Sequence, residues 1–529
     1  MRLLTAFRIH TLDPRQPFVE ALLISGEKIL AAGETETLHR EFPRARHEHL
    51  EGLTLLPGLT DAHLHLQHYA LSLQKVDCET DTLRECLQRV TQRARTTPPD
   101  AWILGHGWNQ NTWPDTPSGG FPTAADLDAV TGQRPAYLTA KSLHAGWANS
   151  AALRAAGITA STPDPADGRI GRDAHGKPTG MLFESAMHLL AERIPQPAPE
   201  SITQAICEAQ PHLWQAGLTG VHDFDRRESF IALQTLHQRG DLRLRVLKNL
   251  PVDLLDEALA LGLRSGFGDD TLRIGGLKAF ADGALGPHTA AMFVPYQDAP
   301  ANRGMLLLDA EEIYAFGHKA AAGGLALTIH AIGDRANHEV LEAYARLRAF
   351  EKQNGLPPLR HRIEHVQVLH PQDAARLGEL GLIASMQPVH AVSDMHMADR
   401  LWGERARLSY AWRTQLEAGA VLAFGSDAPV ESPNPFWGLH AALTRQRADG
   451  TPEGGWYPAE RLTLREAWRA FTFGAAYAAG MEARLGRLTP GFLADLIALP
   501  ADPFALSPDA IRDLRPQRVM CGGAWVWEA

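Results

Sequence analysis

Eight short apolar runs, most of them separated by stretches with helical periodicity, constrain the fold of this 529-residue chain more than any other feature. Runs of this length are typical of buried strands, and their alternation with helices predicts a parallel sheet. Polar residues stand at the C-terminal ends of the runs, so we predict an α/β fold with a (β/α)₈ TIM barrel. The runs cover residues 54–61, 217–224, 242–247, 272–280, 324–330, 361–367, 382–387 and 421–427.

Three segments do not fit the strand–helix repeat of the barrel. Residues 1–53 and 481–529 hold strand-like pieces with glycine turns, and neither end can build a useful sheet alone. We therefore predict one small β-sandwich domain built from both termini, with the barrel at 54–75 and 199–480. Residues 76–198 are too many for a strand–helix connection and include two strand-like pieces. We expect them to form an inserted subdomain or lid after the first barrel strand.

Composition narrows the classes of partner. Lys and Arg number 51 against 61 Asp and Glu, a net charge of −10 that argues against nucleic-acid binding. No apolar stretch approaches the roughly 18–20 residues of a membrane span. The four cysteines fit no C-x-x-C spacing, whereas 24 histidines point to a metal held by nitrogen and oxygen. We expect a cytoplasmic protein without a membrane or nucleic-acid partner, which acts on a small molecule and could form a homodimer.

The segment GLTDAHLH at residues 58–65 carries the strongest local signal. On a strand, His63 and His65 point to the same face, where two nitrogens could share one metal ion, and Asp61 could orient them. An isolated H-x-H pattern is equally consistent with two core histidines, so the other strand ends must decide. His330, His365 and Asp427 stand at the ends of three further runs, and such ends meet at the catalytic face of a barrel.

Lys278 in the fourth run leads into the same end of the barrel. A buried ammonium is costly, and metal ions beside it would repel it. Two interpretations are open. Lys278 could extend its charged end to Asp282, or it could react with CO₂ and become an anionic ligand that bridges two metals.

Five motifs in order resemble the amidohydrolase superfamily: PGLTDAHLH, GLKAFADGALG, LTIHAIGDRA, RIEHVQ and FGSDAPVESPNP. Within it, the chain is most similar to the branch of YtcJ-like proteins and N-substituted formamide deformylases. The segments GHGWNQ, FPTAADLD, LHAGWANSAAL and GMLFE resemble that branch's insertion. The resemblance covers nearly the whole chain.

The resemblance implies a site with two divalent ions, by default Zn²⁺. His63 and His65 match the first metal's ligands, Lys278 the bridging N6-carboxylated lysine, and His330 and His365 the second metal's ligands. Asp427 matches the catalytic aspartate, which is also a metal ligand. The implied activity is hydrolysis of a C–N bond other than a peptide bond, in an amide or N-substituted formamide, by a metal-bound hydroxide with Asp427 as general base.

Two alternatives remain open at this point. A mononuclear deaminase of a heterocycle or cyclic amidine needs no bridging carbamate, and a non-catalytic metal-binding regulatory protein is a third class. Four residues are candidate substrate contacts, although a tryptophan packs in a core more often than it binds a ligand: Trp108, His144, Glu184 and His390.

Overall fold

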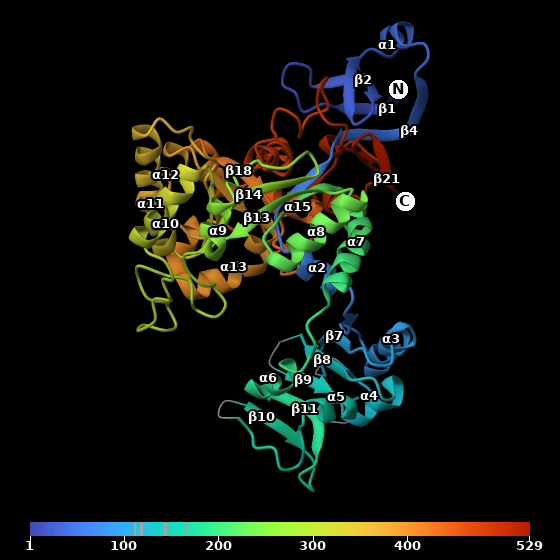
Figure 1. Cartoon of the computed structure of the whole chain (residues 1–529), viewed down its shortest axis with the longest axis vertical. Coiled ribbons are helices and arrows are strands. Elements are labelled where there is room, and N and C mark those ends of the chain that lie inside the picture. The colour runs from blue at the N-terminus through green and yellow to red at the C-terminus, as the bar shows by residue number, and fades with distance from the viewer. Residues whose placement is uncertain (111–112, 117–119, 142–144, 166–167) are drawn as a thin grey trace. The chain divides into compact units, whose positions relative to one another are not determined.

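The computed structural model describes residues 1–110, 113–116, 120–141, 145–165 and 168–529 (Figure 1). The chain forms two compact units. The first comprises Met1–Tyr69 and Ile206–Ala529, and the second comprises Ala70–Ala205.

An eight-stranded parallel sheet forms the centre of the first unit, in the order β18-β17-β16-β15-β14-β13-β12-β5. Each strand pairs with the next one along the chain, as in a (β/α)₈ barrel, and this confirms the predicted fold class. The strands are β5 (Leu59–Leu64), β12 (Leu218–Asp223), β13 (Arg245–Pro251), β14 (Leu272–Phe280), β15 (Leu327–Ala331), β16 (Arg362–His365), β17 (Ile383–Met386) and β18 (Val421–Phe424).

Hydrogen bonds just beyond the strand ends close the ring between β18 and β5. The Asp427 amide donates to the His63 carbonyl oxygen at 2.6 Å, and the His65 amide donates to the Ala428 carbonyl oxygen at 2.8 Å. Two segments from opposite ends of the barrel sequence therefore lie side by side at the point where the predicted site residues stand.

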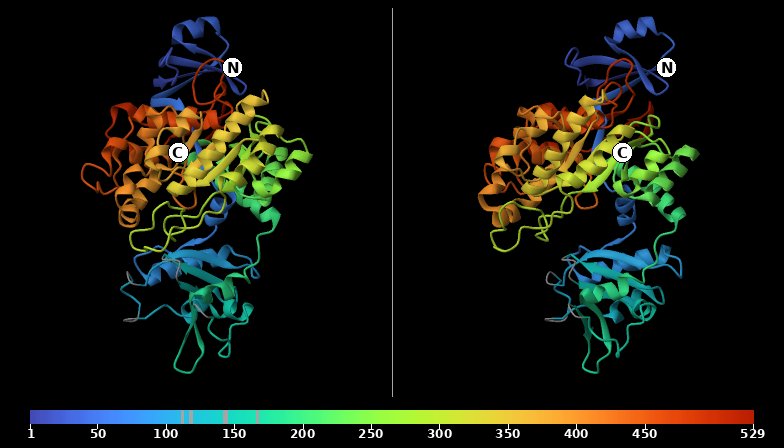
Figure 2. Two further views of the ribbon diagram at one scale, coloured as in Figure 1. Left: turned by 90° about the vertical axis from the view of Figure 1, so that its left-hand side faces the viewer. Right: turned by 60° about the vertical axis from the view of Figure 1, so that its left-hand side comes forward.

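Helices follow most of the barrel strands along the chain. In further views, α10 and α11, drawn in yellow, lie on the outside of the barrel (Figure 2). No helix among the described residues is long and apolar enough to cross a membrane. The helices of four residues or more are α7 (Pro199–Gln215), α8 (Arg227–Arg239), α9 (Leu255–Ala260), α10 (Ala310–Gly323), α11 (Asp334–Gln353), α12 (Arg376–Glu379), α13 (Pro388–Trp402), α14 (Trp412–Glu417), α15 (Pro435–Thr444), α16 (Leu464–Arg469) and α17 (Ala475–Ala478).

Both ends of the chain contribute to a seven-stranded sheet, in the order β21-β20-β19-β4-β1-β2-β3. The N-terminal strands β1–β4 and the C-terminal strands β19–β21 meet where β4 pairs with β19 (Figure 1). The elements are β1 (Arg2–His10), β2 (Phe18–Ser25), β3 (Lys28–Gly33), α1 (Thr35–Glu41), β4 (Arg46–Pro57), β19 (Leu496–Leu499), α18 (Pro508–Arg512), β20 (Arg518–Cys521) and β21 (Ala524–Glu528).

Gly58 separates this sheet from the barrel. Residues 54–57, which were predicted to belong to the barrel, form the end of β4, and β5 begins only at Leu59. A Cβ atom on Gly58 would lie 2.3 Å from the side chain of Thr219 on β12. Because only glycine fits against Thr219 there, one continuous apolar run can pass from one sheet into the other.

The second unit has a six-stranded sheet of its own, in the order β10-β11-β9-β8-β7-β6. Its core includes three mutually packed tryptophans, Trp108, Trp113 and Trp147, with ring centres 6.3 to 6.4 Å apart. The elements that begin within it are β6 (Val76–Asp77), α3 (Leu83–Thr96), β7 (Ile103–Trp108), α4 (Ala124–Thr131), β8 (Ala136–Ala140), β9 (Ala145–Ala148), α5 (Ser150–Ala155), β10 (Gly168–Arg172), β11 (Pro178–Glu184) and α6 (His188–Ala191); α2 (Leu66–Ser72) leads into it.

Candidate metal centre

Residues from strand ends far apart in the sequence come together in the barrel. His63 lies on β5, His330 on β15 and His365 at the end of β16. The centre of the His365 ring lies 4.9 Å from that of His63 and 4.6 Å from that of His330. The structure thus groups three of the histidines that the sequence analysis selected.

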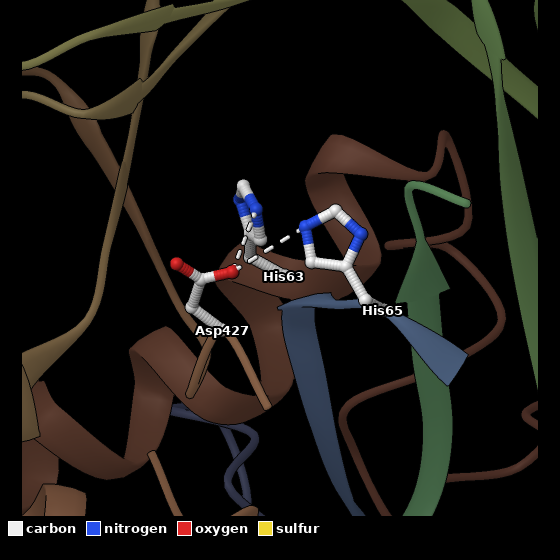
Figure 3. Close-up of side chains that lie close together, drawn as sticks. All are labelled: His63, His65 and Asp427. Atoms are coloured by element: carbon white, nitrogen blue, oxygen red, sulfur yellow. Dashed lines mark ion pairs between the residues drawn. The ribbon is translucent and has the colours of Figure 1, made fainter. Parts of the chain in front are cut away.

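Asp427 completes a compact group with His63 and His65 (Figure 3). Its Oδ1 lies 3.5 Å from His63 Nε2 and 3.5 Å from His65 Nε2. In a tetrahedral site with bonds of about 2.1 Å, neighbouring donor atoms lie about 3.4 Å apart. The spacing therefore fits one divalent cation held by two imidazole nitrogens and a carboxylate oxygen, a donor set that Zn²⁺ and similar ions accept.

Carboxylates hold the other ring nitrogen of His63 and His65. His63 Nδ1 donates to Glu364 Oε2 at 2.5 Å, and His65 Nδ1 donates to Asp225 Oδ1 at 3.0 Å. Because the proton sits on Nδ1 in both rings, Nε2 keeps its lone pair and faces Asp427. These carboxylates orient the two imidazoles as metal ligands require.

Uncharged acceptors hydrogen-bond to one ring nitrogen of His365 and of His330 and orient those two rings. His365 Nδ1 donates to Gln387 Oε1 at 2.8 Å, and His330 Nε2 donates to the Gly283 carbonyl oxygen at 2.8 Å. The lone pair is therefore left on Nε2 of His365 and on Nδ1 of His330. The two histidines present different ring nitrogens to the site.

The buried histidines are held in their neutral form. Burial, reinforced by the Lys278 charge, lowers the pKa of His63 to about 4 and that of His330 to about 3. Burial also lowers the pKa of His365 well below its ordinary value. Only a neutral imidazole binds a metal, so the folded chain keeps these ligands ready at neutral pH.

The sequence analysis missed the role of Glu364. Its carboxylate also accepts a hydrogen bond from Thr328 Oγ1 at 2.9 Å and forms a buried ion pair with Arg362. Burial alone would raise the pKa of Glu364, but Arg362 and His63 outweigh it and hold that pKa well below its ordinary value. Glu364 is therefore a fixed negative charge directly behind the His63 ring. The RIEHVQ motif contained it, but its partner stands 301 positions earlier in the chain.

Asp61, expected to orient the neighbouring imidazoles, supports the backbone. Its Oδ1 accepts from the amides of His63 and Ser426, both at 3.0 Å, and its Oδ2 accepts from Ser426 Oγ at 2.5 Å. Burial raises the pKa of Asp61 to about 7. Asp61 thus fastens β5 to the segment after β18, and Glu364 orients the His63 ring in its place.

Lys278 lies between two aromatic rings. Its Nζ is 4.5 Å from the centre of the Phe224 ring and 4.8 Å from that of Phe280. The pairing with Asp282 is not formed, because the Asp282 carboxylate accepts from three backbone amides. No carboxylate within the described ranges forms an ion pair with Lys278, and burial lowers its pKa to about 8.

A second group of ligand atoms shares Asp427. One ligand atom each of His365, His390 and Asp427 lies within 4.8 Å of the others. His390 is on the first turn of α13 and was predicted as a substrate contact. His330, predicted as a ligand of the second metal, is in no such group among the described residues.

The other predicted substrate contacts belong to the second unit. Trp108 is fully buried in that unit's own core, and its Nε1 donates to the Leu138 carbonyl oxygen at 2.8 Å. This placement makes it a core residue rather than part of an open binding surface. Glu184 ends β11 and is exposed, with a left-handed backbone conformation (φ 50°). His144 lies outside the described residues.

Comparison with known proteins decides the family. A model described as "Amidohydrolase family" matches residues 48–527. The chain belongs to the amidohydrolase family. Within this family it is 32% identical to the putative amidohydrolase YtcJ of Bacillus subtilis over 98% of both chains. It is 30% identical to the N-substituted formamide deformylase of Arthrobacter pascens, over 98% of this chain and 97% of the relative.

Solved structures agree with this amidohydrolase assignment. An uncharacterized metal-dependent hydrolase from Pyrococcus furiosus is 29% identical, with a TM-score of 0.78 over 95% of this chain and 99% of that chain. The chain therefore belongs to the branch of YtcJ-like proteins and N-substituted formamide deformylases, as the motifs indicated.

Proposed function

We propose that this amidohydrolase is a metal-dependent hydrolase of a C–N bond in an amide or N-substituted formamide. One observation carries the proposal: two imidazole nitrogens, each on a ring held by a carboxylate at its other nitrogen, lie 3.5 Å from one oxygen of Asp427. The relative named as an N-substituted formamide deformylase supports the choice of substrate class.

His63, His65 and Asp427 would hold a first divalent cation, and His330, His365 and Lys278 a second. Zn²⁺ is the default ion for such nitrogen and oxygen donors. Divalent cations in this site supply Lewis acidity toward water and toward a substrate carbonyl oxygen.

Lys278 would act as a ligand after reaction with CO₂. Its lone pair attacks the carbon, an N–C bond forms, and the amine proton leaves to solvent, which gives an anionic carbamate. A pKa of about 8 favours this step, because a substantial fraction of the amine is unprotonated near neutral pH. A carbamate also removes the uncompensated positive charge between Phe224 and Phe280.

Asp427 would move the proton. Its carboxylate accepts a proton from the attacking water as the oxygen bonds to the carbonyl carbon, and returns that proton to the leaving nitrogen when the C–N bond breaks. One water is consumed, and a carboxylic acid and an amine are released. The backbone at Asp427 has a positive φ of 61°, and such uncommon backbone conformations cluster at functional sites.

Phe280 would favour a substrate with an apolar substituent. The residue is 48% exposed, and the centre of its ring lies 5.1 Å from that of the His330 ring. An exposed phenyl face beside the site gives an apolar N-substituent a surface to bury. Glu184 and His144 remain predictions from the sequence alone.

A screen with quantified metal content tests the proposal. Protein loaded with Zn²⁺ is offered N-formyl and N-acyl amines, with N-benzylformamide and formamide as a matched pair. We expect formate and benzylamine from the first and much slower turnover of the second. Release of ammonia from heterocycles, without turnover of any amide, would instead indicate the deaminase. Stoichiometric metal without any turnover would favour a binding protein.

A further inference from the structure

His390 has a buried nitrogen without a partner. The side chain is 9% exposed, and its Nε2 is buried without a hydrogen bond to any described residue. Most buried polar atoms in folded proteins are hydrogen-bonded, and those that are not call for an explanation such as a bound ion. The four other histidines of the centre all have a ring nitrogen engaged by an acceptor, so His390 differs from them.

His390 lies beside His365 and Asp427. Its ring stacks on that of His365, with centres 6.1 Å apart and planes 14° apart. A ligand atom of His390 lies within 4.8 Å of ligand atoms of both His365 and Asp427. Ligand atoms that share one cation lie about 3–4 Å apart, so three such atoms within 4.8 Å of one another need only small side-chain rotations to share an ion.

The surroundings of His390 also suit a ligand. It follows β17 on the first turn of α13, whose Pro388 starts the helix. Gln387, the residue before that helix, accepts a hydrogen bond from His365 Nδ1 and so leaves His365 Nε2 as the ligand atom. One short segment after β17 therefore positions both His365 and His390.

We infer that His390 is a metal ligand, which binds the second cation together with His365 and Asp427. The inference rests on the proposed function for the presence of metal and adds a residue outside the ligand set that the family motifs imply. It explains why His390 Nε2 is buried without a hydrogen-bond partner among the described residues. It also makes Asp427 a ligand common to both cation sites, one with His63 and His65 and the other with His365 and His390.

The test measures metal affinity without a substrate. Full-length protein and the variant His390→Phe, which keeps a ring stacked on His365 but has no lone pair, are loaded with Zn²⁺ and titrated with a competing chelator. His396→Phe is the matched control, because His396 lies on the same helix and is exposed. The visible spectrum of the Co²⁺-loaded proteins reports loss of a nitrogen ligand independently.

We expect His390→Phe to lower the affinity for the second equivalent of Zn²⁺ at least about 100-fold. Even residues that only hydrogen-bond to a metal ligand contribute about 10–100-fold to metal affinity. The first equivalent should change less than about 3-fold, and His396→Phe should bind like the unmodified chain. If His390→Phe does not fold, His390→Gln, which keeps a polar side chain, answers the same question. Unchanged affinities and Co²⁺ spectrum, or a single equivalent in the unmodified chain, would overturn the inference.

The two proposals fail in different ways. If the unmodified protein hydrolyses formamides and His390→Phe keeps both metals but raises KM, then His390 contacts substrate and the ligand role is wrong. If His390→Phe loses the second metal and the unmodified protein turns over no amide, then the ligand role holds and the proposed function is wrong.

Discussion

The His63 ring and the Glu364 carboxylate form a hydrogen bond of 2.5 Å, and neither side chain is more than 1% exposed. A charge so close to a neutral imidazole increases the basicity of the opposite nitrogen, which is the one that faces Asp427. The hydrogen bond between Glu364 and His63 therefore orients the ring that would bind the first cation.

Replacing Glu364 with glutamine should lower the affinity for the first metal about 10–100-fold, because the amide keeps the shape but loses the charge. It should also lower the free energy of unfolding by about 3–5 kcal/mol, since Arg362 would be left without its buried counter-charge. Chelator competition and denaturant unfolding measure the two effects. Glu379→Gln, an exposed position, is the control. Unchanged metal affinity would remove Glu364 from the site.

Asp427→Asn should keep the fold and most of the bound metal, yet lower kcat about 10²–10⁴-fold. Asparagine tolerates the left-handed backbone conformation that residue 427 adopts, so the loss should reflect proton transfer and not misfolding. Steady-state kinetics on the substrate found by screening, with metal content measured in parallel, provide the check. A kcat near that of the unmodified protein would rule out Asp427 as the general base.

Lys278→Met should abolish any carbamate and weaken binding of the second metal, while stability should stay equal or rise. Methionine fits between Phe224 and Phe280 without a buried charge, and no ion pair of Lys278 with a described residue is lost. Incubation with ¹³C-bicarbonate should give a carbamate NMR signal in the unmodified protein that the variant lacks. The same spectrum from both proteins would show that Lys278 does not carry a carbamate.

Metal-stripped protein should lose stability as pH falls from 6.5 to about 4. An unfolded histidine takes up a proton near pH 6.5, whereas His63 and His330 do so near 4 and 3 in the folded state. The unfolded state therefore binds more protons in this range, and protonation favours unfolding. Two more histidines with strongly lowered pKa values act in the same direction: His222 and His365.

Two carboxyls oppose this effect. Burial raises the pKa of Asp61 and Asp282 to about 7, so the folded state binds more protons at these two groups between pH 7 and 3.8. Four imidazoles against two carboxyls leave a net loss of stability as the pH falls. Urea unfolding at pH 6.5, 5.5 and 4.5 measures it, and stability that rises on acidification would contradict the assigned neutral histidines.

Gly425→Ala should damage both stability and the metal site. A Cβ atom there would lie 2.5 Å from the His63 amide nitrogen and 2.6 Å from Asp61 Oδ1. Since the His63 backbone cannot move without moving its ring, we expect a loss of about 1–3 kcal/mol together with weaker metal binding. Gly33→Ala, where nothing lies within 4 Å, should leave melting temperature and metal affinity unchanged. Equal stability and metal affinity of the two variants would show that residue 425 does not need to be glycine.

The sequence was sufficient to predict the barrel because strand–helix alternation is a local pattern. It also selected His63, His65 and Asp427, since residues at strand ends of a parallel barrel must meet. The boundary at Gly58 escaped prediction, because the apolar run is continuous there and only the approach of Thr219 divides it.

The supports behind the ligands could not be predicted in the same way. Glu364 and His365 are neighbours, and alternation on a strand would send them to opposite faces. The left-handed backbone at His365 and Val366 (φ 75° and 45°) breaks the alternation, so that both side chains reach the site. Such a conformation depends on tertiary contacts that no local pattern records.

The pairing of β4 with β19 has a consequence for biosynthesis. On the ribosome, β1 to β4 emerge first, but the strand that covers the edge of β4 is made only after the whole barrel. Until then the nascent chain presents an unpaired strand edge with apolar side chains, a surface prone to aggregation. We therefore expect ribosome-bound chains truncated before residue 496 to depend on chaperones, and release of the last strands to end that dependence.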